Sequence, residues 1–168
     1  MTWDEYYHNI CIAVGQRTRC MSRKIGAILV RDKSILATGY NGPSRGVPHC
    51  NERYIIDNEN PEYHDICPRQ VLEFKSGEGL EYCIASHAEA NTIINAAFTG
   101  VKTKGTTMYM TCGIPCKDCL KTIINAGIKE IVVTKLEYYD LLSSFLLINS
   151  SLEVRVFDFI EERMDGNK

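Results

Sequence analysis

The chain has 168 residues, of which 45% are hydrophobic and 24% are charged, and this predicts one globular domain, residues 1–168, with a substantial core. Its formal net charge of -2 excludes the broad basic field that attracts long nucleic acids. No apolar run approaches the length of a membrane span, and the acidic N-terminus lacks an apolar signal core, so we expect a cytoplasmic protein. The eight cysteines are then expected as metal ligands and buried thiols.

The first part of the chain predicts a helix followed by a hairpin. Thr2 and Glu5 fit a capping box, and the helix that they open is expected to run to about Thr18. Apolar runs at 25–30 and 35–40 are separated by a polar turn, which is typical of a β-hairpin. Residues 41–85 are long and irregular, with prolines and glycines spread along them. An irregular insertion of this length is usually functional or partly disordered.

The second half of the chain alternates helices and strands. The predicted elements are a helix at 87–97, a strand at 106–111, a helix at 115–126, a strand at 130–134, a helix at 138–147 and a strand at 153–157. Strands that alternate with helices pair in parallel and are buried. The prediction is therefore an α/β fold, a three-layer α/β/α sandwich with a mixed five-stranded sheet, that binds ligands at the carboxyl ends of its strands.

Three residues of the types that bind zinc lie at the starts of two predicted helices. His87 opens the helix at 87–97, and Cys116 and Cys119 follow Pro115 in the helix at 115–126. Cysteines three positions apart share one helix face, and helix N-termini favour thiolates. A catalytic zinc keeps three protein ligands and leaves its fourth position to a water whose pKa it lowers. We therefore predict that His87, Cys116 and Cys119 bind a catalytic zinc.

Glu89 is the predicted proton carrier of this site. It would take a proton from the water, pass it to the ring nitrogen of an aminopyrimidine and later help ammonia to leave. Ser86-x-x-Glu89 also fits a capping box, which would give Glu89 a role in helix stability alone. Cys-x-x-Cys by itself occurs in structural zinc sites and in redox pairs. The combination of His-x-Glu with a later Pro-Cys-x-x-Cys is typical of zinc-dependent nucleobase deaminases, and it favours the catalytic interpretation.

Two further segments indicate which family within a larger superfamily the chain resembles. They are KIGA at 24–27, which opens the first strand, and GYNGPSRG at 39–46, which follows the second. With the zinc motifs, they make the chain from about residue 2 to about residue 157 similar to the deoxycytidylate (dCMP) deaminases of the cytidine deaminase-like superfamily. The zinc motifs alone would identify only the superfamily, which includes cytidine, guanine, riboflavin-pathway and tRNA adenosine deaminases.

The resemblance implies an activity, an assembly and a regulation. It implies conversion of dCMP to dUMP with release of ammonia, which feeds thymidylate synthesis. It also implies a homohexamer that dCTP, with magnesium, activates and that dTTP inhibits. Composition and motif spacing say nothing about these three properties.

The segment after the second strand is a candidate nucleotide contact. Asn41 offers both a donor and an acceptor to a sugar hydroxyl, and Gly42 permits close backbone approach to a ligand. A plain turn is the alternative, because Asn-Gly-Pro forms turns readily. The resemblance favours nucleotide contact, with Asn41 and Ser86 binding substrate and with Lys24, Gly42 and Arg45 binding an effector.

A second zinc site is a further possibility from the resemblance. Some dCMP deaminases carry another zinc that ties the insertion to the core, but in this chain the stretch before His87 lacks expected ligands at Gly77 and Ala85. The alternative is a set of free cysteines, which are commonly buried. The candidate ligands are Cys20, Cys50, His64, Cys67 and Cys83.

Two other functions stay open from the sequence. The first is another deaminase of the superfamily, acting on a free nucleoside, a base or a nucleic acid such as tRNA. The second is a non-catalytic zinc-binding module that binds a partner, in which a fourth protein ligand would close the zinc site.

Overall fold

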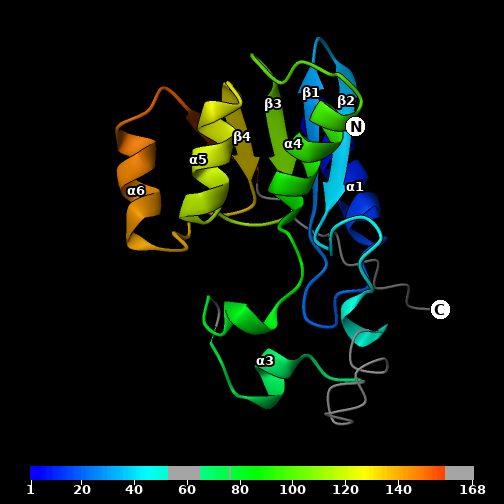
Figure 1. Ribbon diagram of the computed structural model, residues 1–168. Helices are drawn as coiled ribbons and strands as arrows, with labels where there is room; N and C mark the ends of the chain where they lie inside the picture. The colour runs from blue at the N-terminus through cyan, green and yellow to red at the C-terminus, as the bar shows by residue number, and fades with distance from the viewer. Residues whose placement is uncertain (53–64, 76, 158–168) are drawn as a thin grey trace, which may run out of the picture.

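The computed structural model describes residues 1–52, 65–75 and 77–157, and in this part of the chain five strands form one sheet in the order β2-β1-β3-β4-β5 (Figure 1). β1 is antiparallel to both β2 and β3, whereas β3, β4 and β5 are parallel. This confirms the predicted mixed five-stranded sheet. The strands are β1 (Gly26–Arg31), β2 (Ser34–Tyr40), β3 (Thr107–Met110), β4 (Glu130–Val133) and β5 (Glu153–Val156).

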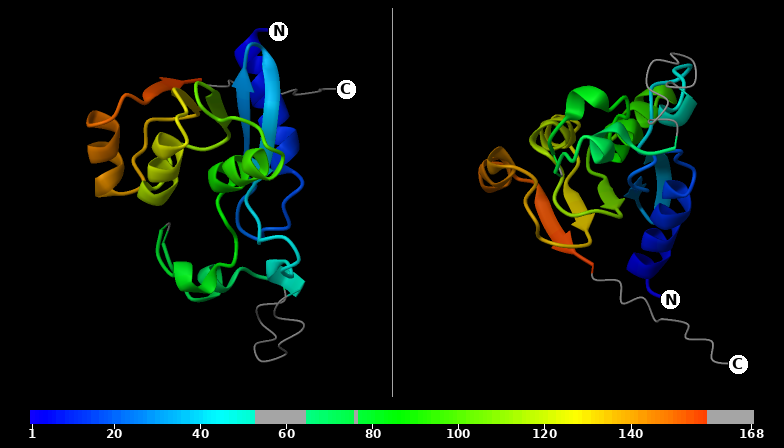
Figure 2. Two further views of the ribbon diagram at one scale, coloured as in Figure 1. Left: turned by 45° about the horizontal axis from the view of Figure 1, so that its top comes forward. Right: turned by 90° about the horizontal axis from the view of Figure 1, so that it is seen from below.

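Helices cover both faces of the sheet and complete the predicted three layers (Figure 2). α1 packs against β1, β2 and β3, while α4 lies on the opposite face beside α5, which in turn contacts α6. Among the described residues of the insertion, two short helices have assigned bounds, and residues 50–52 are also helical. The helices are α1 (Trp3–Gly15), α3 (Pro68–Val71), η2 (Leu80–Tyr82), α4 (Ala88–Phe98), α5 (Lys117–Asn125) and α6 (Leu141–Ile148).

The central strands are buried on both sides, which explains their continuous apolar sequences. In β1, Ala27 and Leu29 join the core under α4 and α5. The alternate residues Ile28 and Val30 pack with Tyr7 of α1. Because successive side chains of a strand point to opposite faces, a buried strand needs apolar residues at every position.

The first helix begins as predicted and ends early. Thr2 Oγ1 accepts a hydrogen bond from the Glu5 amide at 3.2 Å, and the Thr2 amide donates to Glu5 Oε2 at 2.5 Å. This is the predicted capping box. The last helical residue is Gly15, three positions before the predicted end, because the Thr18 hydroxyl turns away to donate to the carbonyl of Asn41.

The start of α4 packs directly on β2 at Gly39. A Cβ at this glycine would lie 2.4 Å from the Thr92 amide nitrogen and 2.8 Å from the Ala88 carbonyl oxygen. Asn91 and Asn95 add side-chain bonds, since their Nδ2 atoms donate to the carbonyls of Tyr40 at 2.8 Å and Thr38 at 2.7 Å. The depth of α4 on the sheet is therefore fixed by the absence of a side chain at Gly39.

Asp140 caps α5 and α6 together. Its Oδ1 accepts from the Ser143 amide at 2.9 Å, inside its own helix α6, and its Oδ2 accepts from the Lys117 amide of α5 at 2.8 Å. The buried Ser143 hydroxyl donates to the carbonyl of Pro115 at 3.0 Å. Cys116, the residue before α5, makes no side-chain cap bond of its own, so α6 supplies the cap that α5 lacks.

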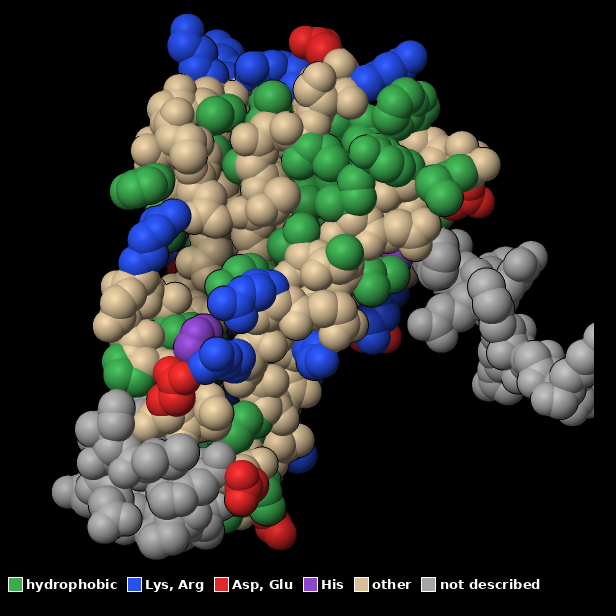
Figure 3. Space-filling view, turned by 90° about the vertical axis from the view of Figure 1, so that its right-hand side faces the viewer, with side chains coloured by type: hydrophobic (Ala, Val, Ile, Leu, Met, Phe, Trp, Pro, Cys, Tyr) green, Lys and Arg blue, Asp and Glu red, His purple; other side chains and the backbone are tan. Residues whose placement is uncertain are grey.

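Basic side chains do not form a continuous track on the face shown in Figure 3. Lys and Arg gather in one group at the top and in another in the lower half, and apolar side chains lie between them (Figure 3). In the described ranges, every helix is too short or too polar to cross a bilayer.

Gly39→Ala should unfold at a lower temperature and bind less zinc. The new Cβ must push the first turns of α4 away from β2, and overpacking of this kind costs about 3 kcal/mol. Thermal unfolding and metal analysis of the purified variant would measure both effects. Gly100→Ala is the matched control, because its Cβ would enter open space and only its φ of +72° is unfavourable, which costs about 1 kcal/mol. Wild-type stability of Gly39→Ala would contradict the close contact.

Asp140→Ala should weaken zinc binding without removing any proposed ligand. The loss of one cap on each of two helices costs about 1 kcal/mol per cap and leaves the start of α5 less fixed. Competition with a chelator would measure the zinc affinity. Asp118→Ala is the control on α5, since its carboxylate is exposed and, among the described residues, pairs only with Lys121. Equal zinc affinity in the two variants would show that the double cap does not position the site.

Candidate functional site

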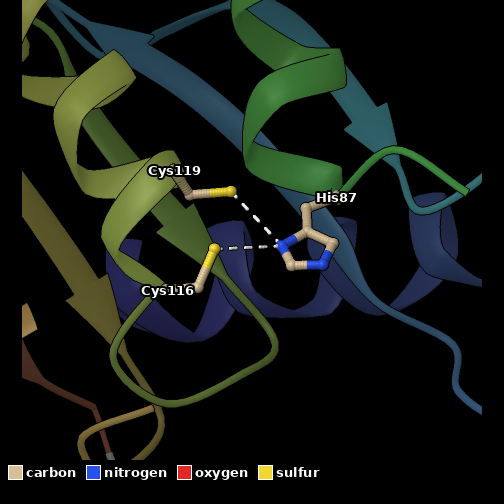
Figure 4. Close-up of side chains that lie close together, drawn as sticks. All are labelled: His87, Cys116 and Cys119. Atoms are coloured by element: carbon tan, nitrogen blue, oxygen red, sulfur yellow. Dashed lines mark hydrogen bonds between the residues drawn. The ribbon is translucent and has the colours of Figure 1, made fainter. Parts of the chain in front are cut away.

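The structure brings His87, Cys116 and Cys119 together, as predicted. His87 precedes the first residue of α4, Cys116 precedes α5, and Cys119 is the third residue of α5. The ligand atoms all lie within 4.8 Å of one another. His87 Nδ1 is 3.5 Å from the Cys116 sulfur and 3.4 Å from the Cys119 sulfur (Figure 4). Among the described residues this is the only such group of metal-ligating side chains.

The spacing of these atoms fits zinc. Zn–S bonds of about 2.3 Å and Zn–N bonds of about 2.0–2.1 Å in a tetrahedron set nitrogen and sulfur roughly 3.5 Å apart. The two N···S distances agree with that value. Within the described ranges no fourth His, Cys, Asp or Glu joins the group. Three protein ligands and an open position are typical of a catalytic zinc and not of a structural one.

The pKa values of the two cysteine thiols are shifted in opposite directions. The hydrogen bond with Cys119, followed by that with His87, lowers the pKa of Cys116 to about 4. The pKa of Cys119 is raised by the same bond to Cys116 and by burial, and the pKa of His87 is raised chiefly by its bond to Cys116. The lowered pKa of Cys116 favours its thiolate form. A divalent cation would displace the protons that Cys119 and His87 keep.

Glu89 lies in the first turn of α4 with 4% of its surface exposed. Burial raises the pKa of its carboxyl, and the charge of His87 opposes this rise. The capping-box interpretation of Glu89 is wrong, because His87 and not Ser86 precedes the helix, and no side chain caps α4. The backbone of Ser86 pairs instead with Gly42 in an antiparallel bridge.

Asn41 is buried close to the start of β1, with 7% of its surface exposed. Its Oδ1 accepts from the Ile25 amide at 2.9 Å, and its Nδ2 donates to the Arg23 carbonyl at 3.0 Å. These bonds hold the segment before β1, which gives Asn41 a structural role. The substrate contacts of Asn41 and Ser86 stay predictions.

The two predicted effector cations are exposed: Lys24 lies just before β1, and Arg45 lies in the segment that follows β2. Lys24 Nζ donates to Gln16 Oε1 at 2.9 Å. Arg45 Nη2 donates to Asn95 Oδ1 at 2.6 Å, and its guanidinium lies 4.3 Å from the centre of the Phe98 ring. Neither cation forms an ion pair with a described residue. Their effector roles, and that of Gly42, stay predictions.

The second zinc site is not assembled from the residues that the structure describes. Four of its candidate ligands are cysteines outside any disulfide, and they form no second group of three metal-ligating side chains with other described residues. The fifth, His64, lies outside the described residues, so this site stays a prediction. The four thiols are Cys20, Cys50, Cys67 and Cys83.

Two residues that the sequence analysis missed lie near His87. The ring of Tyr139 meets the His87 ring edge-on, with the ring centres 6.4 Å apart. The charge of Arg69, from α3, acts on both of these rings. The sequence predicts a helix at 138–147 that would include Tyr139, but α6 begins at Leu141, which leaves Tyr139 in the loop beside the site. No local pattern marks either residue, because the insertion and this loop meet only in the folded chain.

Comparison with known proteins agrees with the geometry. A family model described as the cytidine and deoxycytidylate deaminase zinc-binding region matches residues 1–135. Deoxycytidylate deaminase of Mycobacterium phage D29 is 33% identical over 138 residues, which cover 79% of this chain and 94% of that protein. Deoxycytidylate deaminase of Saccharomyces cerevisiae is 31% identical over 161 residues, 96% of this chain but 46% of the yeast protein. The chain thus spans about half the length of that relative.

The fold is shared as well. The crystal structure of dCMP deaminase from the cyanophage S-TIM5 in complex with dCMP and dUMP superimposes with a TM-score of 0.66 and 26% identity. The match covers 91% of this chain and 95% of the cyanophage chain. With a matching family model over most of its length, a relative of similar length and the His/Cys/Cys group in place, the chain belongs to the cytidine and deoxycytidylate deaminase family of zinc-binding proteins.

Proposed function

We propose that the protein is a zinc-dependent hydrolase that deaminates dCMP to dUMP and ammonia. The observation that carries this proposal is the three-ligand group of His87, Cys116 and Cys119 next to the buried carboxyl of Glu89. Zinc is the metal expected there from the family and from the donor atoms. The substrate is supported by relatives that are deoxycytidylate deaminases and by the nucleotides bound in the cyanophage structure.

The reaction adds the oxygen of water to C4 of the cytosine ring and removes the amino group as ammonia. Zinc, when bound by His87, Cys116 and Cys119, supplies a Lewis acid that lowers the pKa of water. Glu89 moves the protons. It accepts one from the attacking water, donates it to N3 of the ring, and then assists protonation of the departing amino group. Burial suits this role, because it raises the pKa of Glu89 toward the working pH.

The finer properties implied by the resemblance belong to this proposal. We propose a cytoplasmic homohexamer that supplies dUMP for thymidylate synthesis, activated by dCTP with Mg²⁺ and inhibited by dTTP. Lys24 and Arg45 are the proposed contacts for effector phosphates. Their support is that each cation bonds to a neutral side chain and, among the described residues, to no carboxylate.

Another deaminase of the superfamily is the second candidate function. A long nucleic acid is disfavoured as its substrate by the net charge of -2 and by the divided basic groups of Figure 3. A non-catalytic zinc module is disfavoured by the three-ligand group. It would need a closing ligand from outside the described residues.

The proposal predicts ammonia release from zinc-loaded protein given dCMP, with little from deoxycytidine, CMP or guanine. Each substrate should be tested alone, with dCTP plus Mg²⁺, and with dTTP. Turnover of dCMP that rises with dCTP and falls with dTTP is the expected result. Activity on another substrate alone would assign the protein to a different branch of the superfamily. Turnover of dCMP that neither dCTP nor dTTP changes would contradict the proposed regulation.

Glu89→Gln should keep the fold and the zinc but lose roughly 10²- to 10⁴-fold in kcat, because the amide cannot carry the proton. Cys116→Ala should lose the metal itself. Metal analysis and steady-state kinetics on both variants separate the two roles. Glu153→Gln, an exposed change in β5, is the matched control and should leave kcat unaltered. Full activity of Glu89→Gln would show that another group moves the proton.

A further inference from the structure

The insertion forms one side of the space in front of His87. Figure 1 shows α3 and η2 below the end of the sheet at which α4, α5 and α6 begin. The loop between the two short helices reaches the candidate site at Gly77. A Cβ at this glycine would lie 3.5 Å from the Tyr139 ring, and that ring meets His87 edge-on. The insertion, Tyr139 and the metal group are therefore contiguous.

Arg69 of α3 is held by backbone within this lobe. Its Nε donates to the Glu78 carbonyl at 2.7 Å, and its Nη2 donates to the Lys75 carbonyl at 3.2 Å. Among the described residues no carboxylate pairs with Arg69, and its Nη1 has no hydrogen bond. Arg69 as a residue is partly exposed, and both of these hydrogen bonds lie at the surface. It is a cation of fixed orientation with donors to spare.

Printed contacts connect Arg69 to the site. The two carbonyls that accept from Arg69, those of Lys75 and Glu78, belong to the turn that contains Gly77. A Cβ at Gly77 would lie 3.5 Å from the Tyr139 ring, and that ring meets the His87 ring edge-on. Arg69 is therefore bonded to the same turn that approaches the candidate site.

We propose that Arg69 binds the 5′-phosphate of the substrate nucleotide, with the Tyr139 ring against the sugar or base between the phosphate and the metal group. This inference rests on the proposed function and adds the feature that separates a nucleotide from a nucleoside. A nucleoside monophosphate carries its anion one sugar away from the reacting ring. Arginine suits this anion, because its planar donors pair with two phosphate oxygens at once.

Arg31 is a matched control, because it is an arginine with similar backbone contacts away from the candidate site. Its Nη1 also donates to two backbone carbonyls, those of Lys102 at 3.0 Å and Lys104 at 3.3 Å. It lies at the end of β1 next to the hairpin turn, at the opposite end of the sheet from α3 (Figure 1). Arg31→Gln therefore removes the same kind of backbone contact and no charge from the candidate site.

The test compares dCMP with deoxycytidine in the wild type, Arg69→Gln, Arg69→Lys and Arg31→Gln. Loss of a charged hydrogen bond to phosphate is worth roughly 10- to 100-fold. Arg69→Gln should raise KM for dCMP by that factor while leaving kcat/KM for deoxycytidine unchanged, and Arg69→Lys should recover part of the loss. Arg31→Gln should change neither substrate. Calorimetric binding of dUMP and deoxyuridine to the same proteins gives a second readout that needs no turnover.

The outcomes separate this inference from the proposed function. If Arg69→Gln affects both substrates equally, or affects neither, Arg69 only holds the insertion and the inference is wrong, whereas dCMP turnover by the wild type still supports the function. If the wild type turns over no cytosine substrate, the proposed function fails. Arg69 is then judged on binding alone: selective loss of dUMP binding supports it, and equal binding of dUMP by wild type and Arg69→Gln overturns it.

Discussion

The contact of α4 with β2 is the constraint on which the candidate site depends. Glycine at position 39 lets the helix lie so close that its backbone touches the strand. The amides of Asn91 and Asn95 then fix its position along the strand by bonding to carbonyls that the edge strand leaves unpaired. His87 and Glu89 lie at the start of this helix, so the distance between α4 and β2 also sets their positions. A methyl group at one position remote from the chemistry would displace both.

The second half of the site is positioned by a different means. Cys116 directs its thiol to His87 and cannot cap its own helix, so the carboxylate of Asp140 bonds to the first amide of α5 from outside. The start of α5 therefore lacks a cap from its own N-cap side chain, and Asp140 of the neighbouring helix supplies that hydrogen bond. This explains why α6, which provides no ligand, is packed against α5.

The sequence predicted most of the fold and the central group of the site. Alternating helices and strands gave the mixed sheet and its layers, and residue type with spacing gave His87, Cys116, Cys119 and Glu89. Element ends were less predictable, because they depend on distant partners. The Thr18 hydroxyl bonds to the carbonyl of Asn41 and lies outside α1, and Tyr138 and Tyr139 precede α6, which Asp140 caps. No sequence pattern pointed to Arg69, because its position depends on how the irregular insertion folds back toward the site. The roles of Ser86 and Asn41 were ambiguous, because their local patterns fit both a ligand contact and a backbone support.

The bridge between Gly42 and Ser86 has a consequence for the history of the protein. The amide of each residue bonds to the carbonyl of the other, at 3.1 and 2.9 Å, so the chain leaves the sheet and returns to it at one point. For a loop with joined ends, each doubling of length costs only about 0.6 kcal/mol in closure entropy. Residues 43–85 can therefore lengthen, shorten or be exchanged during evolution while strand register and the metal group stay as they are. The same sheet is thus open to new ligand preferences through one replaceable segment.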